Sequence, residues 1–387
     1  MKFLVALMTV VACSACVANP PSFHVEHRAL FDVEQRVVLA ELNLRQEDGA
    51  VVSFDFNAPT SRYSGFEGSG TVERQGRRVL WAPPPEGGQL RYVVEVDRNR
   101  GGSGWDARFT EDWALLRLDN VFPAAALRTR GVETSSASLI LEGPEGWSME
   151  TRYGKVLGPI ELPMDSGRLY VRPNGWMVAG VIGVRREEVG HTEFVIAAPV
   201  GHGMRRLDML TFLRFTAPTF NEIVTPLPER VLIVGAEEGF WRGALSGPNS
   251  LYLHADRPIV SENATSTLLH ELVHVAGRVD GDDWIVEGMA EYYALRVLRD
   301  SGGLSSARYD KALNDLLAWA QREGGGLKDP SKGADTACAA WVLAGLDEAL
   351  PGGLKRWIDS RSKSLTGQAL RAYAKARGVA LRSCETN

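Results

Sequence analysis

Hydrophobic and polar residues alternate in short runs over residues 20–195. Examples are RVVLAELNL, VVSFDF, LRYVVEV and ASLILEG, and pieces rich in glycine or proline, such as APPPEGG and RNRGGSG, separate them. A period of two over runs of this length is typical of strands with one buried face. The pattern therefore predicts an N-terminal β-rich domain that resembles a β-sandwich.

The pattern changes near residue 196, where segments with helical spacing begin. RRLDMLTFLRFTAPTFNEIV predicts a helix interrupted near Pro218, and RVLIVGA and SLYLHA predict strands. Beyond residue 303, ARYDKALNDLLAWAQ, TACAAWVLAGLDEAL and LTGQALRAYAKARG predict further helices. Strands followed by helices indicate an α+β fold class.

Two helices are predicted in the middle of this second half, at about 265–276 and about 283–300. Serine and threonine precede the first helix and Gly277 follows it, while Asp282 or Asp283 precedes the second. These residue types begin and end helices. Because the connection is short and contains glycine, we expect the two helices to pack as an antiparallel pair.

The first 19 residues have the pattern of a targeting segment. MKFLVALMTVVACSAC has one lysine, an apolar run over residues 3–12, and then small residues and cysteine. The run is too short to span a bilayer and predicts a signal peptide of the lipoprotein type, with Cys16 as the lipidated residue. Cys13 is an alternative, and so is ordinary cleavage near Ala18. Each alternative predicts an exported protein, in the periplasm or anchored to the outer membrane only by its lipid.

Composition and charge limit the classes of function. The chain has 387 residues, 44% of them hydrophobic and 24% charged, which suits two or three globular domains. The formal net charge of −5 gives no reason to expect a nucleic-acid partner. The oligomeric state does not follow from the sequence.

Only two cysteines, Cys338 and Cys384, follow the predicted leader. In an exported protein such a pair is more often a disulfide than a metal site. We therefore expect a bridge that ties the C-terminal tail to a helix, with two free buried thiols as the alternative.

The segment TLLHELVHVAG contains the most specific candidate chemistry. Residues four apart share one face of a helix, so His270 and His274 can present their rings to one ion. Glu271 lies beside that face and can reach a water on the metal without binding the metal itself. Zinc hydrolases need this division between two imidazoles and one carboxylate base. The alternative is a surface helix with incidental histidines.

A third ligand is available on the second helix of the pair. Glu287 lies in DDWIVEGMAEYYALRVL, and an antiparallel pair brings it back to the histidines. Two histidines and one glutamate form a known catalytic zinc set. Glu291, one turn further along, is placed to accept the N–H of a liganding histidine, or it is only a solvated carboxylate. His24 and His27 are three apart in a predicted strand and point to opposite faces, which makes them a poor ligand pair.

HELVH followed by WIVEGMAEYY resembles the gluzincin metallopeptidases, in which W-x-x-E-G-x-x-x-Y is a common second motif. The similarity is greatest to the bacterial glycyl aminopeptidases and their relatives in the aminopeptidase N clan. The resemblance implies one Zn²⁺ per chain, with His270, His274 and Glu287 as ligands and Glu271 as the general base. It also implies a peptide or protein substrate.

The same resemblance implies a division of the chain. Residues 20–195 would form the β-rich domain, residues 196–302 a thermolysin-like zinc domain, and residues 303–387 a helical C-terminal domain. The segment GALSGPNSLYL, residues 243–253, is similar to the edge-strand segment that precedes the zinc helix in that clan.

Two departures from the family pattern concern specificity and catalysis. Aminopeptidases of the clan carry a glutamate on the edge segment that binds the substrate's amino terminus, and Ser246 stands at the matching position here. The later helix also lacks the tyrosine that stabilises the oxyanion. Possible substitutes are Tyr292, Tyr293, Tyr309, His254 and His202.

Two functions remain from the sequence. The first is a zinc-dependent metallopeptidase of the bacterial cell envelope, in which Glu271 activates a water on zinc. The second is a catalytically inactive zinc-binding lipoprotein that serves as a scaffold or partner-binding module. The presence of Glu271 favours the first function, because a structural zinc site needs no general base.

Overall fold

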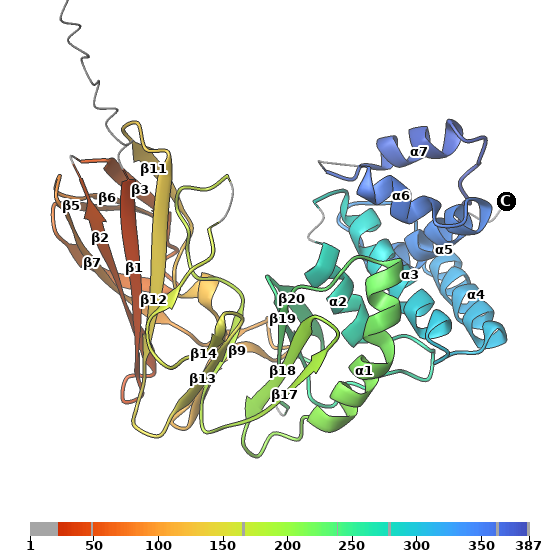
Figure 1. The fold of residues 1–387 in the computed structure, drawn as a ribbon, viewed down its shortest axis with the longest axis horizontal. Coiled ribbons are helices and arrows are strands. Elements are labelled where there is room, and N and C mark those ends of the chain that lie inside the picture. The colour runs from red at the N-terminus through yellow and green to blue at the C-terminus, as the bar shows by residue number, and fades with distance from the viewer. Residues whose placement is uncertain are drawn as a thin grey trace, which may run out of the picture.

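The structure is a computed structural model that describes residues 22–47, 49–164, 167–237, 239–277, 280–360 and 364–384. The predicted signal peptide, with Cys13 and Cys16, lies outside the described residues. Figure 1 shows an N-terminal β region, a smaller sheet in the middle and a group of helices at the C-terminal side. This order confirms the predicted α+β fold class.

The N-terminal region consists of short strands in three sheets. The orders are β15-β12-β1-β2-β7-β4, β14-β13-β16-β10-β9-β8 and β11-β3-β6-β5. The strands are β1 (Ser22–Asp32), β2 (Val37–Gln46), β3 (Val51–Asn57), β4 (Tyr63–Gly68), β5 (Thr71–Gln75), β6 (Arg78–Ala82), β7 (Gly87–Glu95), β8 (Arg98–Asn99), β9 (Trp105–Phe109), β10 (Trp113–Arg117), β11 (Ala125–Thr129), β12 (Thr134–Glu142), β13 (Ser148–Thr151), β14 (Gly154–Lys155), β15 (Ile160–Glu161) and β16 (Trp176–Gly180).

One hydrophobic core holds these three sheets together, and it follows from the alternating pattern. In β1, Phe23 and Val25 are buried, whereas His24 and Glu26, which alternate with them, are half-exposed. In the four-stranded sheet, Phe54 of β3 stacks on Trp81, its partner on β6, with ring centroids 5.2 Å apart. The region is therefore a sandwich-like body with its own core, as its period-two runs predict.

A five-stranded sheet follows, in the order β17-β18-β19-β21-β20. The strands β18, β19 and β21 are parallel, and β17 and β20 are antiparallel strands at the two edges. A division at residue 195 falls inside β18, so we place the start of this lobe before β17. The strands are β17 (Ile182–Val189), β18 (Thr192–Pro199), β19 (Arg230–Val234), β20 (Ala244–Gly247) and β21 (Ser250–Leu253).

Seven α-helices complete the described part of the chain. They are α1 (Arg206–Ile223), α2 (Thr267–Gly277), α3 (Asp283–Asp300), α4 (Ser306–Arg322), α5 (Gly333–Ala349), α6 (Gly353–Asp359) and α7 (Gly367–Lys375); one 3₁₀ turn, η1 (Leu118–Asn120), lies in the β region. None of the helices in the described ranges is both long and apolar enough to cross a membrane.

Helix α1 differs from its prediction, because it continues through Pro218 to Ile223. Proline removes only one backbone hydrogen bond from the helix. Ala217 and Phe220, on either side of Pro218, are buried in the core of the lobe. The burial of this apolar face offsets the missing bond, and the predicted interruption near Pro218 is wrong.

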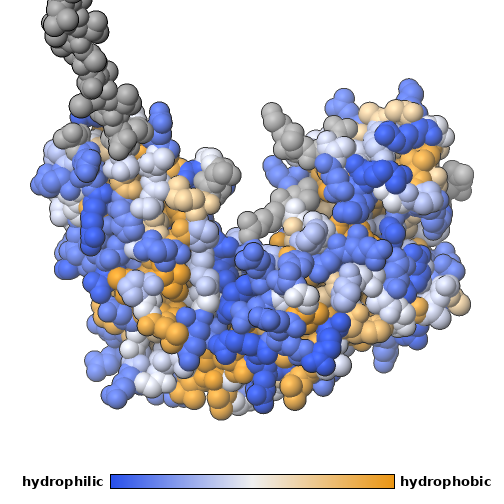
Figure 2. Space-filling view, in the orientation of Figure 1, coloured by the Kyte–Doolittle hydropathy of each residue, from blue (hydrophilic) through white to orange (hydrophobic). Residues whose placement is uncertain are grey.

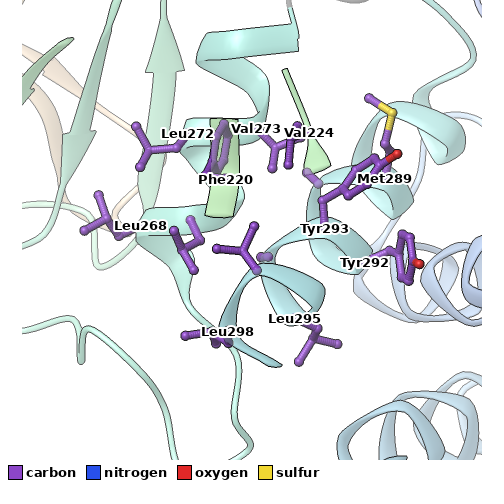
Figure 3. Close-up of a cluster of buried hydrophobic side chains, with 14 of the residues drawn as sticks. Phe220, Val224, Leu268, Leu272, Val273, Met289, Tyr292, Tyr293, Leu295 and Leu298 are labelled. Atoms are coloured by element: carbon purple, nitrogen blue, oxygen red, sulfur yellow. The ribbon is translucent and has the colours of Figure 1, made fainter. Parts of the chain in front are cut away.

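The helix pair α2 and α3 forms the centre of the second core. Figure 3 shows Leu268, Leu272 and Val273 of α2 in the same cluster as Leu295 and Leu298 of α3. The bounds of α2 lie within two residues of the predicted range of about 265–276, and the bounds of α3 match the predicted range of about 283–300. Their hydrophobic faces therefore pack together and leave polar faces for a site.

The C-terminal part of the chain packs against α3. A Cβ added at Gly288 would lie 2.3 Å from the Cβ of Ala339, so only glycine permits the close approach of α3 and α5. At the start of α3, the Asp282 backbone N–H donates to the Leu365 carbonyl over 2.8 Å, and the Asp282 carboxylate accepts from the Gly367 N–H over 2.7 Å. Leu365 lies just before α7 and Gly367 is its first residue, so these two bonds clamp the start of α3 to the start of α7.

A disulfide joins Cys338 on α5 to Cys384, with the two Cα atoms 5.8 Å apart. This is the pairing expected from the sequence. Both cysteines are buried, in a small cluster with Ala337 and Val342. The bridge fixes the C-terminal tail against α5.

Candidate active site

Two histidines and a glutamate on the α2–α3 pair form a compact polar group. His270 Nε2 lies 3.2 Å from His274 Nε2 and 3.3 Å from a carboxylate oxygen of Glu287. His274 Nε2 lies 3.4 Å from the other oxygen of Glu287. One ligand atom from each residue lies within 4.8 Å of the other two.

These spacings fit a zinc ion. Three ligand atoms at about 2.1 Å from one ion in tetrahedral geometry are about 3.4 Å apart, close to the separations in this group. Two imidazoles and one carboxylate are also ligand types that zinc prefers, and they leave a fourth position open. His270, His274 and Glu287 are therefore the residues of the described chain that would hold the metal.

Glu291 lies behind His270, on the side away from the ligand group. Its carboxylate is 3.1 Å from His270 Nδ1, so a protonated Nδ1 donates to it. This contact leaves Nε2 unprotonated and directed at the ligand group. Glu287 contacts both histidines, whereas the later residue Glu291 contacts the earlier histidine, His270, as expected for two helices that run in opposite directions.

The charges within the group shift the pKa values of its members. Burial lowers the pKa of His270, but its hydrogen bonds to Glu287 and Glu291 outweigh this and raise the pKa to about 10. Burial raises the pKa of Glu287, whereas its hydrogen bonds to His270 and His274 bring it well below the usual value. The carboxylates of Glu287 and Glu291 therefore favour positive charge at this group.

Glu271 projects from the same helix but lies outside the ligand triad. Its exposed fraction is 8%. Burial is the main cause that raises the pKa of Glu271, while the two histidines and a hydrogen bond from the Ser246 backbone act in the opposite direction. A carboxylate whose pKa is raised by burial is suited to take up a proton.

A cavity of about 740 Å³ adjoins this group, at the seam between the β region and the edge strand β20. His274 and Ser246 line it from the second lobe, together with the turn that follows β20. Figure 2 shows that the surface is hollowed between the β region and the C-terminal helices, and that hydrophilic residues predominate on the visible floor of the hollow. The remaining lining includes Arg117, Asp119, Arg152, Tyr153, Arg168, Tyr170, Arg172 and Asn174.

Packing across the seam fixes the position of this cavity. Trp176 of β16 is buried, and its indole N–H donates to the Leu245 carbonyl of β20 over 2.9 Å. Arg117 of β10 donates to the Ser246 carbonyl over 3.3 Å. The β region therefore forms one wall of the site.

Tyr292 and Tyr293 do not face the ligand group. Tyr292 is 3% exposed, and its hydroxyl donates to Asp347 over 2.7 Å. Tyr293 is 1% exposed and lies in the same hydrophobic cluster (Figure 3). The structure does not support either residue as an oxyanion or substrate donor, because neither hydroxyl is accessible from the cavity.

The other substitutes for the missing tyrosine also lie elsewhere. Tyr309 is buried under the guanidinium of Arg299, 4.3 Å from its ring centroid. His202 and His254 line two other cavities, and the Nδ1 atom of each accepts a backbone N–H. Ser246 is the one residue of the expected substrate-binding set that borders the cavity next to His274.

Sequence reasoning missed the arginines of the β region that line the cavity. Arg117 ends β10, Arg152 follows β13, and Arg172 lies in the segment before β16. They are far apart in the chain and far from HELVH, so no spacing pattern connects them.

No protein-family model and no curated protein sequence matches the chain. Solved structures nevertheless match its fold. An aminopeptidase N family protein from Idiomarina loihiensis matches with a TM-score of 0.63 and 14% identity, over 91% of this chain and 69% of that chain. The M1 zinc metallopeptidase from Deinococcus radiodurans matches with a TM-score of 0.55 and 14% identity, over 93% of this chain and 90% of that chain.

A mutant M1 zinc metallopeptidase from Deinococcus radiodurans, bound to a Tyr-Ser-Ala substrate, matches with a TM-score of 0.54 and 14% identity, over 94% of this chain and 91% of that chain. The group formed by His270, His274 and Glu287 also fits the HExxH…E pattern that the sequence displays. The chain thus has the fold of the M1 zinc metallopeptidases, the aminopeptidase N family.

Proposed function

We propose that this protein is a zinc-dependent metallopeptidase that hydrolyses peptide bonds. The observation that carries the proposal is the ligand group of His270, His274 and Glu287, with ligand atoms spaced as zinc requires, and Glu271 beside it. The binding of a Tyr-Ser-Ala substrate to a protein of the same fold supports a peptide substrate.

Zinc in this site would supply the positive charge that acidifies a water and polarises the scissile carbonyl. Glu271 accepts the proton of the attacking water and later delivers it to the leaving amine. The raised pKa of Glu271 suits a group that holds a proton between these two transfers. Glu291 keeps the His270 ring oriented by accepting from Nδ1.

The proposal includes export from the cytoplasm. Its support is the leader MKFLVALMTVVACSAC, with Cys16 as the proposed lipidation site. The disulfide between Cys338 and Cys384 agrees with an oxidising compartment. Metabolic labelling with a fatty acid, in the wild type and in Cys16→Ser, tests the anchor.

The decisive test combines zinc content with turnover in the Glu271→Gln variant. We expect about one zinc per chain in both proteins, and a loss of turnover of about 10²- to 10⁴-fold in the variant. The matched control is Asp310→Asn, an exposed carboxylate on α4. Turnover that survives in Glu271→Gln, with zinc retained, would contradict the assigned base.

The second candidate function is an inactive zinc-binding scaffold. It is favoured by the buried positions of Tyr292 and Tyr293, which leave no tyrosine of α3 near the ligand group. A wild-type protein that holds zinc but cleaves nothing in a diverse peptide library would support this function over the peptidase.

A further inference from the structure

The cavity beside His274 has an unusual balance of charge. Arginines outnumber acidic residues among its described lining residues, where Asp119 is the single carboxylate. Arg117 is already paired with Asp119, since its Nη2 lies 3.0 Å from a carboxylate oxygen. The charges of Arg152 and Arg172 are not compensated in this way, because neither guanidinium contacts a carboxylate among the described residues.

Arg152 is held in position by an aromatic neighbour, without an anionic partner in the described part of the chain. Its guanidinium lies over the ring of Tyr153, 4.3 Å from the centroid, and its Nη2 donates to the Tyr153 hydroxyl over 3.2 Å. Gly175 leaves room for the side chain, because a Cβ there would lie 2.8 Å from Arg152 Cδ. The Nε atom is buried and has no hydrogen-bond partner within the described ranges.

Arg172 is held by neutral groups. Its Nη1 donates to the carbonyls of Asp119 and Phe122, over 2.9 and 2.8 Å. These bonds to neutral carbonyls orient the guanidinium and do not neutralise its charge. Two oriented guanidinium groups in a partly buried cavity form a strong site for a carboxylate.

We propose that this cavity binds a carboxylate of the peptide substrate, with Arg152 and Arg172 as the specificity-determining residues. The inference rests on the proposed peptidase function, since the cavity reaches the candidate ligand His274 and the edge residue Ser246. A substrate that passes along β20 presents its groups to both. The same arginines disfavour a free ammonium group there, and Ser246 offers no counter-charge to one.

The carboxylate can be an acidic side chain or the carboxyl terminus of the peptide, and binding measurements separate these sources. The probes are four peptides with one backbone sequence. The first is blocked at both ends with glutamine at one position. The second carries glutamate there, the third has a free carboxyl terminus, and the fourth has a free amino terminus. Calorimetry on the full-length, zinc-loaded Glu271→Gln protein measures affinity without cleavage.

We expect one of the two anionic probes to bind about 10- to 100-fold more tightly than the neutral probe. Arg152→Gln should reduce that preference to below about threefold, and Arg152→Lys should retain part of it. Arg185→Gln is the control, because Arg185 is exposed on β17, the edge of the five-stranded sheet opposite β20. It should leave the preference unchanged.

Three outcomes would overturn the inference: equal binding of neutral and anionic probes by the parent protein, tightest binding of the free-amine probe, or a preference that persists in a folded Arg152→Gln variant. The comparison within the parent protein needs no arginine variant, so misfolding of Arg152→Gln does not prevent a decision. Carboxylate preference without cleavage by the wild type would refute the peptidase function and support the carboxylate site. Cleavage without carboxylate preference would support the peptidase function and refute the carboxylate site.

Discussion

Two histidines, one buried in the β region and one on the helix pair, differ in their hydrogen-bond partners. His27 is fully buried between the sheets of the β region, where its Nδ1 donates to the Ser138 carbonyl over 3.3 Å and its Nε2 accepts from the Tyr170 hydroxyl over 3.4 Å. His270 is largely buried between α2 and α3 and faces Glu287 and Glu291.

The pKa values of these two histidines move in opposite directions. Burial is the main cause that lowers the pKa of His27 to about 3, because both of its partners are neutral. Burial also lowers the pKa of His270, but two carboxylates reverse the shift. Burial alone therefore does not mark a functional histidine; the anionic partners do.

The largest effect should come from removing a carboxylate of the ligand group. We expect Glu287→Ala to weaken zinc binding by well over the 10- to 100-fold that is typical of partners outside the ligand set. Competition with a chromophoric chelator measures the affinity, and Asp310→Ala on α4 is the control. Zinc affinity equal to that of the wild type would remove Glu287 from the ligand set.

A smaller loss should follow from changing the partner of His270. Glu291→Ala should weaken zinc binding about 10- to 100-fold, because the His270 ring loses the acceptor that fixes its tautomer. Glu291→Gln keeps a hydrogen-bond acceptor and should lose less. If both variants bind zinc within twofold of the wild type, other contacts set the orientation of the ring.

His27 should make stability depend on pH. Since its pKa is about 3 in the folded chain and 6.5 ordinarily, the unfolded chain binds more protons between these values. Its contribution is present above pH 6.5 and is lost as pH falls towards 3. We expect the free energy of unfolding to fall by about 2 kcal/mol from pH 7 to pH 5 because of this residue.

Urea unfolding at the two pH values, in the wild type and in His27→Gln, measures this contribution. The variant is less stable at pH 7 but should lose about 2 kcal/mol less on acidification. An equal loss in both proteins would show that other groups cause the pH dependence.

The smallest effect is expected for His24, the neighbour of His27 on the opposite face of β1. Its ring nitrogens lie 2.8 and 3.0 Å from the hydroxyls of Ser136 and Ser138, in a half-exposed position. His24→Ala should cost less than about 1 kcal/mol of unfolding free energy. A cost near that of a core substitution would contradict the surface role of this residue.

The ligand set could be predicted from sequence because its geometry is local. His270 and His274 are four apart on one helix, and a short connection returns Glu287 and Glu291 to them. The arginine-lined cavity could not be predicted, because its residues come from separate elements of the β region. Their meeting depends on how the whole β region packs against β20.

Helical geometry alone places Tyr292 and Tyr293 away from the ligand group, and this could have been worked out from the sequence. At about 100° per residue, Tyr292 lies about 140° and Tyr293 about 240° around α3 from Glu287, whereas Glu291 lies only about 40° away. The two tyrosines therefore belong to the face opposite the ligands. The continuation of α1 through Pro218 had no such signal, since it depends on burial against the rest of the lobe.

The clamp at the start of α3 sets an order of assembly. The ligands on α2 and α3 leave the ribosome well before residues 365–367, whose backbone groups bind Asp282. Until that late segment is made, the helix that carries Glu287 lacks an anchor at its first turn. The candidate zinc site is thus completed by a segment that is made well after its ligands, and a nascent chain stalled before residue 365 would hold the ligands without the support that aligns them.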